Sequence, residues 1–170
     1  MLPFRNPFVW LLRFRHRRGY GIHSPFAYNL VTQVLYCPGR YYADERLDGL
    51  FKWWERIFCH RRVSRNRLLF RLANYWQPKE VYIPGFVGSK TQSYLHAGCR
   101  KTRQMFVDDE VITLQGPRGK MVVVCDLNRY SRHWRNLVND SRATVTFDLC
   151  DMGVAIFLPK MKKQHYIINW

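Results

Sequence analysis

The sequence predicts an α/β fold in which helices come first and strands follow. Apolar residues recur at helical spacing up to about residue 76, and after Gln77 and Pro78 the pattern changes to the short apolar runs typical of strands. One further helix is expected at about Ser131–Asn139, between two of these runs, so at least one helix connects strands. Turns separate the last three runs, which predicts an antiparallel end to the sheet.

The segment 1–76 is expected to contain four helices. Residues 7–18 alternate large apolar side chains with arginines, which predicts a short basic amphipathic helix. In the next helix Ser24 is a suitable N-cap and Pro25 a suitable first residue. Leucines and aromatic residues share one face over about Asp44–Phe58 and again over about Ser64–Trp76, so both segments are predicted to be helical.

The segment 77–170 is expected to form the sheet and to pack with the helical segment as one unit. Each strand is predicted from a short run of apolar residues. The runs lie at residues 80–83, 104–107, 111–114, 121–125, 143–149, 154–158 and 165–170.

The chain is strongly basic. It has 170 residues, with 28 Lys and Arg against 12 Asp and Glu, which gives a net charge of +16. Hydrophobic residues make up 47% and aromatic residues 16%, a composition that excludes wholesale disorder. A positive field of this strength attracts polyanions such as nucleic acid, acidic lipid or phosphorylated metabolites, although the same charge could serve solubility alone.

The cysteine pattern and the N-terminus favour a cytoplasmic protein. The five cysteines are widely spaced and include no C-x-x-C pair, so reduced thiols are expected rather than a zinc site or a disulfide framework. The arginines near the N-terminus follow a short apolar patch, which is the reverse of the order in a secretory signal. No run reaches the roughly 20 apolar residues that cross a bilayer, so no transmembrane segment is expected.

A glycine-containing turn follows the first predicted strand. Gly85 and Gly88 lie in the segment PGFVGSKT, and such a turn lets a ligand approach the backbone and the N-terminus of the next helix. The spacing of the two glycines does not match the phosphate-binding motif GxxxxGK[ST]. A plain turn with a solvated Lys90 is the alternative.

Two acidic positions are candidates for binding. Asp126 ends the apolar run MVVVCD, where α/β proteins place ligand-binding groups, but it could equally cap the following helix or pair with Arg129. The cluster Asp108–Glu110 is expected to be a surface turn rather than a metal site. No histidine pair has metal-ligand or catalytic spacing, so neither a metal nor a catalytic residue is assigned.

Basic and aromatic residues alternate in two segments, 4–20 and 52–76. Such interleaving can bind nucleic acid or another anionic surface through phosphate contacts and stacking. The alternative is that the aromatic residues fill the core, since several fall at core spacing. The candidate anion-binding residues are Arg13, Arg15, Arg17, Arg18, Arg61, Arg62, Arg65 and Arg67.

Four blocks of the sequence resemble a group of bacterial class I methyltransferases that use S-adenosylmethionine (SAM). Chains of that group begin with a basic helix and a G-I-H-S-P-F motif, and this chain begins with RRGYGIHSPFAYNLVTQVLY. The block RLLFRLANYWQPKEVYIPG resembles the helix and first strand before the SAM loop. The blocks MVVVCDLNRYSRHWRNL and ATVTFDLCDMGVAIFLPKMKKQHYIINW resemble the fifth strand with its helix and the closing antiparallel strands.

The resemblance implies a reduced Rossmann-like sheet with a damaged cofactor site. Ile83 stands where the family has an acidic residue, and His96 aligns with the carboxylate that binds the ribose hydroxyls. The glycine loop is one residue short, and the stretch between Thr91 and Met121 cannot hold the usual second to fourth strands with their helices. Losing two charge-assisted hydrogen bonds would cost roughly 1.5–3 kcal/mol each, so micromolar SAM affinity would fall to millimolar or worse.

Three functions follow as expectations. The first is a shortened, degenerate methyltransferase-like protein with weakened or lost SAM binding and catalysis; in any surviving pocket, Gly85 and Gly88 would line the methionine end, His96 would take the ribose position and Asp126 would lie near the substrate. The second is a non-catalytic basic module that binds nucleic acid or an acidic lipid surface. The third is an assembly partner whose sheet edges, exposed by the shortening, pair with another chain, either a second copy or a different protein.

Overall fold

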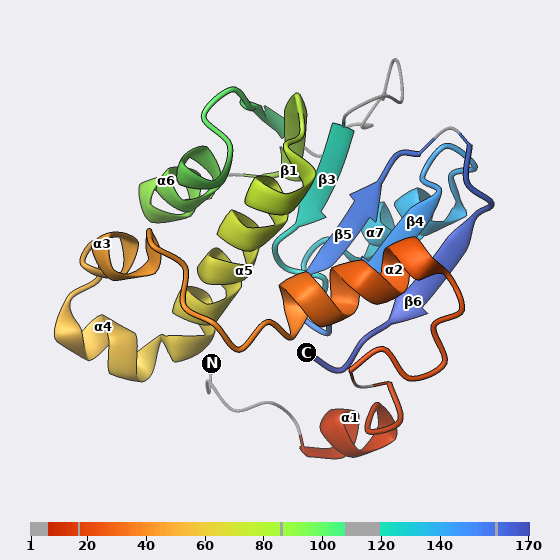
Figure 1. Cartoon of the computed structure of the whole chain (residues 1–170), viewed down its shortest axis with the longest axis horizontal. Helices are drawn as coiled ribbons and strands as arrows, with labels where there is room; N and C mark the ends of the chain where they lie inside the picture. The colour runs from red at the N-terminus through yellow and green to blue at the C-terminus, as the bar shows by residue number, and fades with distance from the viewer. Residues whose placement is uncertain (1–6, 17, 86, 108–119, 159) are drawn as a thin grey trace.

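The computed structural model describes residues 7–16, 18–85, 87–107, 120–158 and 160–170. It is a mixed α/β fold with a six-stranded, mostly parallel sheet (Figure 1), which confirms the α/β class and is compatible with a Rossmann-like fold. The helical elements are α1 (Pro7–Leu12), α2 (Pro25–Leu30), the π-helical turn η1 (Val31–Leu35), α3 (Asp44–Asp48), α4 (Trp53–Phe58), α5 (His60–Trp76), α6 (Ser89–Gly98) and α7 (Ser131–Asn139). The strands are β1 (Glu80–Pro84), β2 (Arg103–Val107), β3 (Lys120–Val124), β4 (Val145–Asp148), β5 (Gly153–Ile156) and β6 (Gln164–Ile167).

The order of strands across the sheet is β2-β1-β3-β5-β4-β6. Strand β1 runs parallel to both β2 and β3, whereas β5 runs antiparallel to both β3 and β4. The expectation of an antiparallel C-terminal end is therefore right for β5 and wrong for β6, which pairs parallel to β4. Because β3 and β4 occupy both sides of β5, β6 does not pair with the strand that precedes it in the chain and lies instead at the outer edge of β4.

Both faces of the sheet are covered by helices. On one face α2, η1 and α5 bury Leu30, Val34 and Leu69 in the same cluster as Ile83 and Val123 of the sheet. On the other face α7 covers strands β3 and β5 with apolar side chains of its own. The N-terminal helices and the sheet thus contribute to one continuous core.

Two of the predicted helices differ from the observed ones. The segment expected as one helix over 44–58 forms α3 and α4, separated by a turn in which the amide of Phe51 donates to the carbonyl of Asp48 at 3.0 Å. This break lets the Phe51 ring become buried beside Tyr94 of α6, with ring centroids 6.3 Å apart. The helix expected over 7–18 ends at Leu12, because Arg13 turns inward to Asp148.

Other predictions of local structure are confirmed. The hydroxyl of Ser24 accepts a hydrogen bond from the amide of Ala27 at 3.4 Å, and Pro25 begins α2. Helix α5 covers the predicted segment but begins earlier, at His60. Six of the seven predicted strands overlap an observed strand, and the seventh, 111–114, lies outside the described residues.

Candidate functional site

The sheet has a topological switch point between β1 and β3. From β1 the chain passes through α6 to β2 on one side, and β3 then pairs with β1 on the other side. In open α/β sheets, ligands bind outside the carboxyl ends of the strands at such a point. The candidate site therefore consists of the turn after β1, the start of α6 and the segment after β3.

The two glycines of the turn have different structural roles. Gly85 has φ +70, a left-handed conformation that favours glycine. Gly88 is the N-cap of α6, and its carbonyl accepts from the amides of Thr91 at 2.9 Å and Gln92 at 3.3 Å. A Cβ added at Gly88 would meet no atom within 4 Å, so the backbone at the start of α6 is open on that side.

The side chain of Tyr130 occupies the space above Gly85. A Cβ at Gly85 would overlap the Tyr130 hydroxyl oxygen and would lie 2.8 Å from its Cζ. The tyrosine is held by its own amide, which donates to the carbonyl of Asp126 at 3.0 Å, and by an edge contact with the ring of His133 at 5.9 Å. No feature of the sequence pattern singled out this residue, because its role depends on how the segment after β3 folds back over β1.

Asp126 lies at the predicted strand end, but one of its oxygens is already engaged. Its Oδ1 accepts hydrogen bonds from the amides of Asn128 at 3.2 Å and Arg129 at 3.1 Å. Such an Asx turn closes the loop that leads to α7. Helix α7 begins after Tyr130 without a side-chain cap, so Asp126 closes this turn and does not cap the helix.

The cations nearest to this edge of the sheet have protein partners. The Arg65 guanidinium donates to the carbonyl of Cys125 at 2.7 Å, and Arg61 lies 3.4 Å from Asp151. At the first turn of α6, Lys90 binds both carboxylate oxygens of Glu55 at 2.7 and 2.8 Å, and this bond holds the pKa of Glu55 below its usual range. Arg61 and Lys90 are thus engaged in ion pairs, whereas Arg65 binds the carbonyl of Cys125 through one nitrogen and its buried Nε has no hydrogen-bond partner among the described residues.

The thiol of Cys125, which directly follows β3, is protonated at neutral pH. Burial raises the pKa of Cys125 to about 11. Because the thiolate is the nucleophilic form, Cys125 is not suited to covalent catalysis.

The structure confirms the expected position of Ile83 at the end of the first strand but not that of His96 at the end of the second. Ile83 is fully buried near the end of β1, so this position offers no acceptor. His96, expected at the end of the second strand, is instead an exposed residue in the last turn of α6. The helix continues through this segment because Gly98 packs closely on α5, where an added Cβ would lie 2.5 Å from the carbonyl oxygen of Phe70. The second strand is β2, and Asp108–Glu110 follow it directly, outside the described residues.

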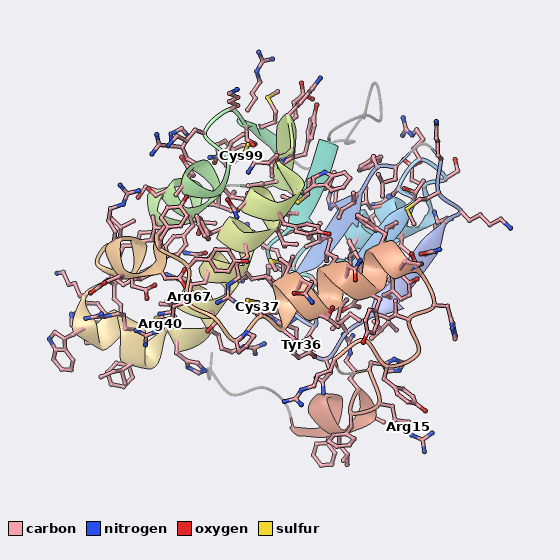
Figure 2. All side chains as sticks on the ribbon, viewed as in Figure 1. Arg15, Tyr36, Cys37, Arg40, Arg67 and Cys99 are labelled. Carbon is pink, nitrogen blue, oxygen red and sulfur yellow. The ribbon has the colours of Figure 1, made fainter. Side chains whose placement is uncertain are left out.

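The eight candidate arginines do not form one surface. Arg13 binds Asp148 through two nitrogens at 2.7 and 3.2 Å, and Arg67 binds the carboxylate of Asp48. With Arg61 and Arg65, four of the eight therefore have contacts within the protein. Arg15, Arg18 and Arg62 are exposed, and Arg17 lies outside the described residues. In Figure 2, Arg67 lies left of the centre of the molecule and Arg15 lies at its lower right, beside α1.

His96 belongs to a separate groove between α3 and α6. The groove has a volume of about 510 Å³, and its walls combine apolar and basic side chains. They are Arg46, Leu47, Leu50, Ser93, His96, Ala97 and Arg100.

The sheet has two edges, formed by β2 and β6. Met105 and Phe106 are exposed on β2, while the edge at β6 adjoins the segment whose His16 carbonyl accepts from the amide of Asn169 at 2.7 Å. Pairing of another chain with either edge stays a prediction.

Searches for metal sites, membrane spans and relatives add no assignment. Among the described residues, no three His, Cys, Asp or Glu side chains converge as metal ligands, and no helix is long and apolar enough to cross a membrane. A scan of protein-family models, a search of curated proteins and a search of solved structures each found no match for the chain.

Proposed function

We propose that this chain is a non-catalytic, methyltransferase-like protein whose SAM crevice is closed by its own Tyr130. The observation that carries the proposal is the position of the Tyr130 hydroxyl over Gly85. The two residues meet at the switch point, which is the ligand site of an open α/β sheet. By resemblance to the methyltransferases, the methionine end of SAM would need the space that this ring fills.

The other described groups of the crevice also do not fit SAM. Ile83 provides no acceptor at the end of β1, and Asp126 already accepts two amides through Oδ1. Losing one charge-assisted hydrogen bond costs roughly 1.5–3 kcal/mol, which is roughly a 10- to 150-fold loss of affinity. We therefore derive no methyl-transfer step.

An acidic residue after β2 could still bind the ribose of SAM, so we propose that recognition of the ribose is weakened and not abolished. Asp108 follows β2 and lies 20 residues after Gly88. Dinucleotide-binding proteins place their ribose-binding acidic residue about 20 residues after the glycine turn. Asp108 therefore replaces His96 as the candidate for the ribose position.

A thermal-shift titration with SAM tests the proposal. A ligand at 100 times its Kd stabilises a folded protein by about 2.7 kcal/mol, which raises Tm measurably. We expect no rise in Tm at micromolar SAM and at most a small one at millimolar SAM. A saturable rise at micromolar SAM would overturn the proposal.

Binding of a polyanion is the second candidate function. It is favoured by the net charge of +16 and by the exposure of Arg15, Arg18 and Arg62, none of which forms an ion pair with a described residue. We expect binding to heparin that weakens steeply as salt rises, because phosphate or sulfate contacts release counterions. Absent or salt-insensitive binding would rule this function out.

A further inference from the structure

Helix α4 has its polar side toward the protein and its apolar side toward the surroundings. Trp53, Trp54, Ile57 and Phe58 are 68%, 44%, 60% and 67% exposed, and no residue of the helix is buried. At 100° per residue these four positions fall within an arc of about 140°. Helices of globular proteins normally bury such an arc, whereas α4 exposes it.

Polar contacts hold α4 in this orientation. Glu55 accepts from the amide of Lys52 at 2.8 Å, which caps the helix, and binds Lys90 of α6 through both carboxylate oxygens. Since the only acidic side chain of α4 is bound to the neighbouring helix, the apolar side is held outward. The exposed residues form a contiguous patch, and such patches on proteins mark interaction sites.

The exposed charges around this face are mostly positive. Lys52, Arg56 and Arg62 are exposed beside it, and Lys52 Nζ lies 5.9 Å from the centre of the Trp54 ring. The nearby acidic residues are mostly turned inward. Asp44 and Asp48 are buried against Arg71 and Arg67, and Glu55 binds Lys90, which leaves Glu45 as the exposed one in residues 41–62.

A second short helix, α1, also exposes apolar side chains next to basic ones. Phe8, Leu11 and Leu12 of α1 are 73%, 65% and 81% exposed, and Arg15 and Arg18 follow them. In Figure 1, α1 lies at the bottom of the molecule and α4 at its lower left. Aliphatic side chains have no ring face on which bases could stack, so their presence on both helices favours lipid over nucleic acid.

We propose that the apolar face of α4, with its basic margin, docks on a bilayer surface that contains anionic lipid. Tryptophan is favoured at the level of the headgroups, and nearby Lys and Arg bind acidic headgroups. A single short apolar anchor binds weakly, so we assign α1 as the second contact. This inference deepens the second candidate function by naming its partner and is independent of the SAM crevice.

Sedimentation with lipid vesicles tests this inference. The full chain should bind phosphatidylcholine vesicles that contain phosphatidylglycerol and should bind pure phosphatidylcholine vesicles far less. The double variant W53A/F58A should bind the anionic vesicles at least tenfold more weakly, the change that corresponds to about 1.4 kcal/mol of lost apolar burial. The control Tyr75→Ala removes an aromatic ring from α5 that is as exposed as Trp54, at 45%, and should bind like the wild type.

Heparin binding separates the outcomes. If the wild type binds heparin but not anionic vesicles, the lipid inference fails while the polyanion function stands. If it binds anionic vesicles through Trp53 and Phe58 but not heparin, the lipid inference stands alone. Equal vesicle binding by W53A/F58A and the wild type, or dimerisation that this variant abolishes without any vesicle binding, would overturn the inference. Because all the replaced side chains are exposed, circular dichroism should show the same folded state for every variant.

Discussion

Replacing Gly85 by alanine tests whether Tyr130 fills the turn after β1. Gly85 has φ +70, and a non-glycine residue in this region costs about 1–2 kcal/mol. The new Cβ would also overlap the Tyr130 hydroxyl, so the ring must move, and overpacking of this kind costs about 1–3 kcal/mol. Because the hydroxyl is the far end of a side chain and can move, we expect an overpacking cost in the lower part of its range. Together with the backbone cost, Gly85→Ala should lower the free energy of unfolding by about 2–4 kcal/mol.

A double-mutant cycle isolates the contact. In a Tyr130→Ala background only the cost of the backbone conformation remains, so Gly85→Ala should then cost about 1–2 kcal/mol. The expected coupling energy is about 1 kcal/mol or more, measured from urea unfolding of the four proteins. Gly88→Ala is the matched control, because its φ is −61 and its surroundings are open, and it should show no coupling to Tyr130. Additive free energies for Gly85 and Tyr130, within about 0.5 kcal/mol, would refute the reasoning.

Three further predictions concern the surrounding framework. Asp48 accepts from Arg67 and, at 2.6 Å, from the buried Tyr94 hydroxyl, so Asp48→Asn should cost about 2–3 kcal/mol in urea unfolding. The comparison variant Asp140→Asn, at a half-buried residue whose partner Arg142 is exposed, should cost about 1 kcal/mol or less. Burial opposes ionisation of Asp48, but hydrogen bonds from Arg67 and Tyr94 lower its pKa overall. Its contribution to stability is therefore present above the ordinary carboxyl pKa of about 4 and is lost as pH falls below it. A free energy of unfolding of the wild type that does not fall as pH drops below about 4 would contradict this. Cys125, with a pKa of about 11, should resist alkylation at pH near 8 until the protein unfolds, whereas the half-buried Cys59 should react earlier. Equal alkylation rates for the two cysteines, measured by mass spectrometry, would contradict the burial of Cys125. Gly98→Ala should lower stability by about 1–3 kcal/mol, since α5 and α6 must separate around the new Cβ, and an unchanged Tm would show that the helices are not so closely packed.

Local signals in the sequence predicted much of the fold. Ser24 and Pro25 predicted the start of α2 because capping depends on residues next to each other in the chain. The runs around Val81 and Val123 predicted buried strands, since both strands are covered on each face. Strand order could not be predicted in the same way, because β6 pairs with β4 and not with β5, the strand that precedes it in the chain.

Less of the candidate site than of the fold could be predicted from the sequence. Gly85, Gly88 and Asp126 were placed at one edge of the sheet, because each follows a predicted strand. His96 was misplaced, since the close contact of Gly98 with α5 extends α6 through that segment. Tyr130 carries no motif and is recognised only through a contact with a residue 45 positions earlier in the chain.

Calorimetric titration of SAM into Tyr130→Ala tests the central claim most directly. With the ring removed, the space over Gly85 is open, so the variant should bind SAM measurably more tightly than the wild type. Tyr130→Phe keeps the ring and should stay closed. Equal SAM affinity in the wild type and Tyr130→Ala, whether strong or absent, would contradict the account that this tyrosine closes the crevice.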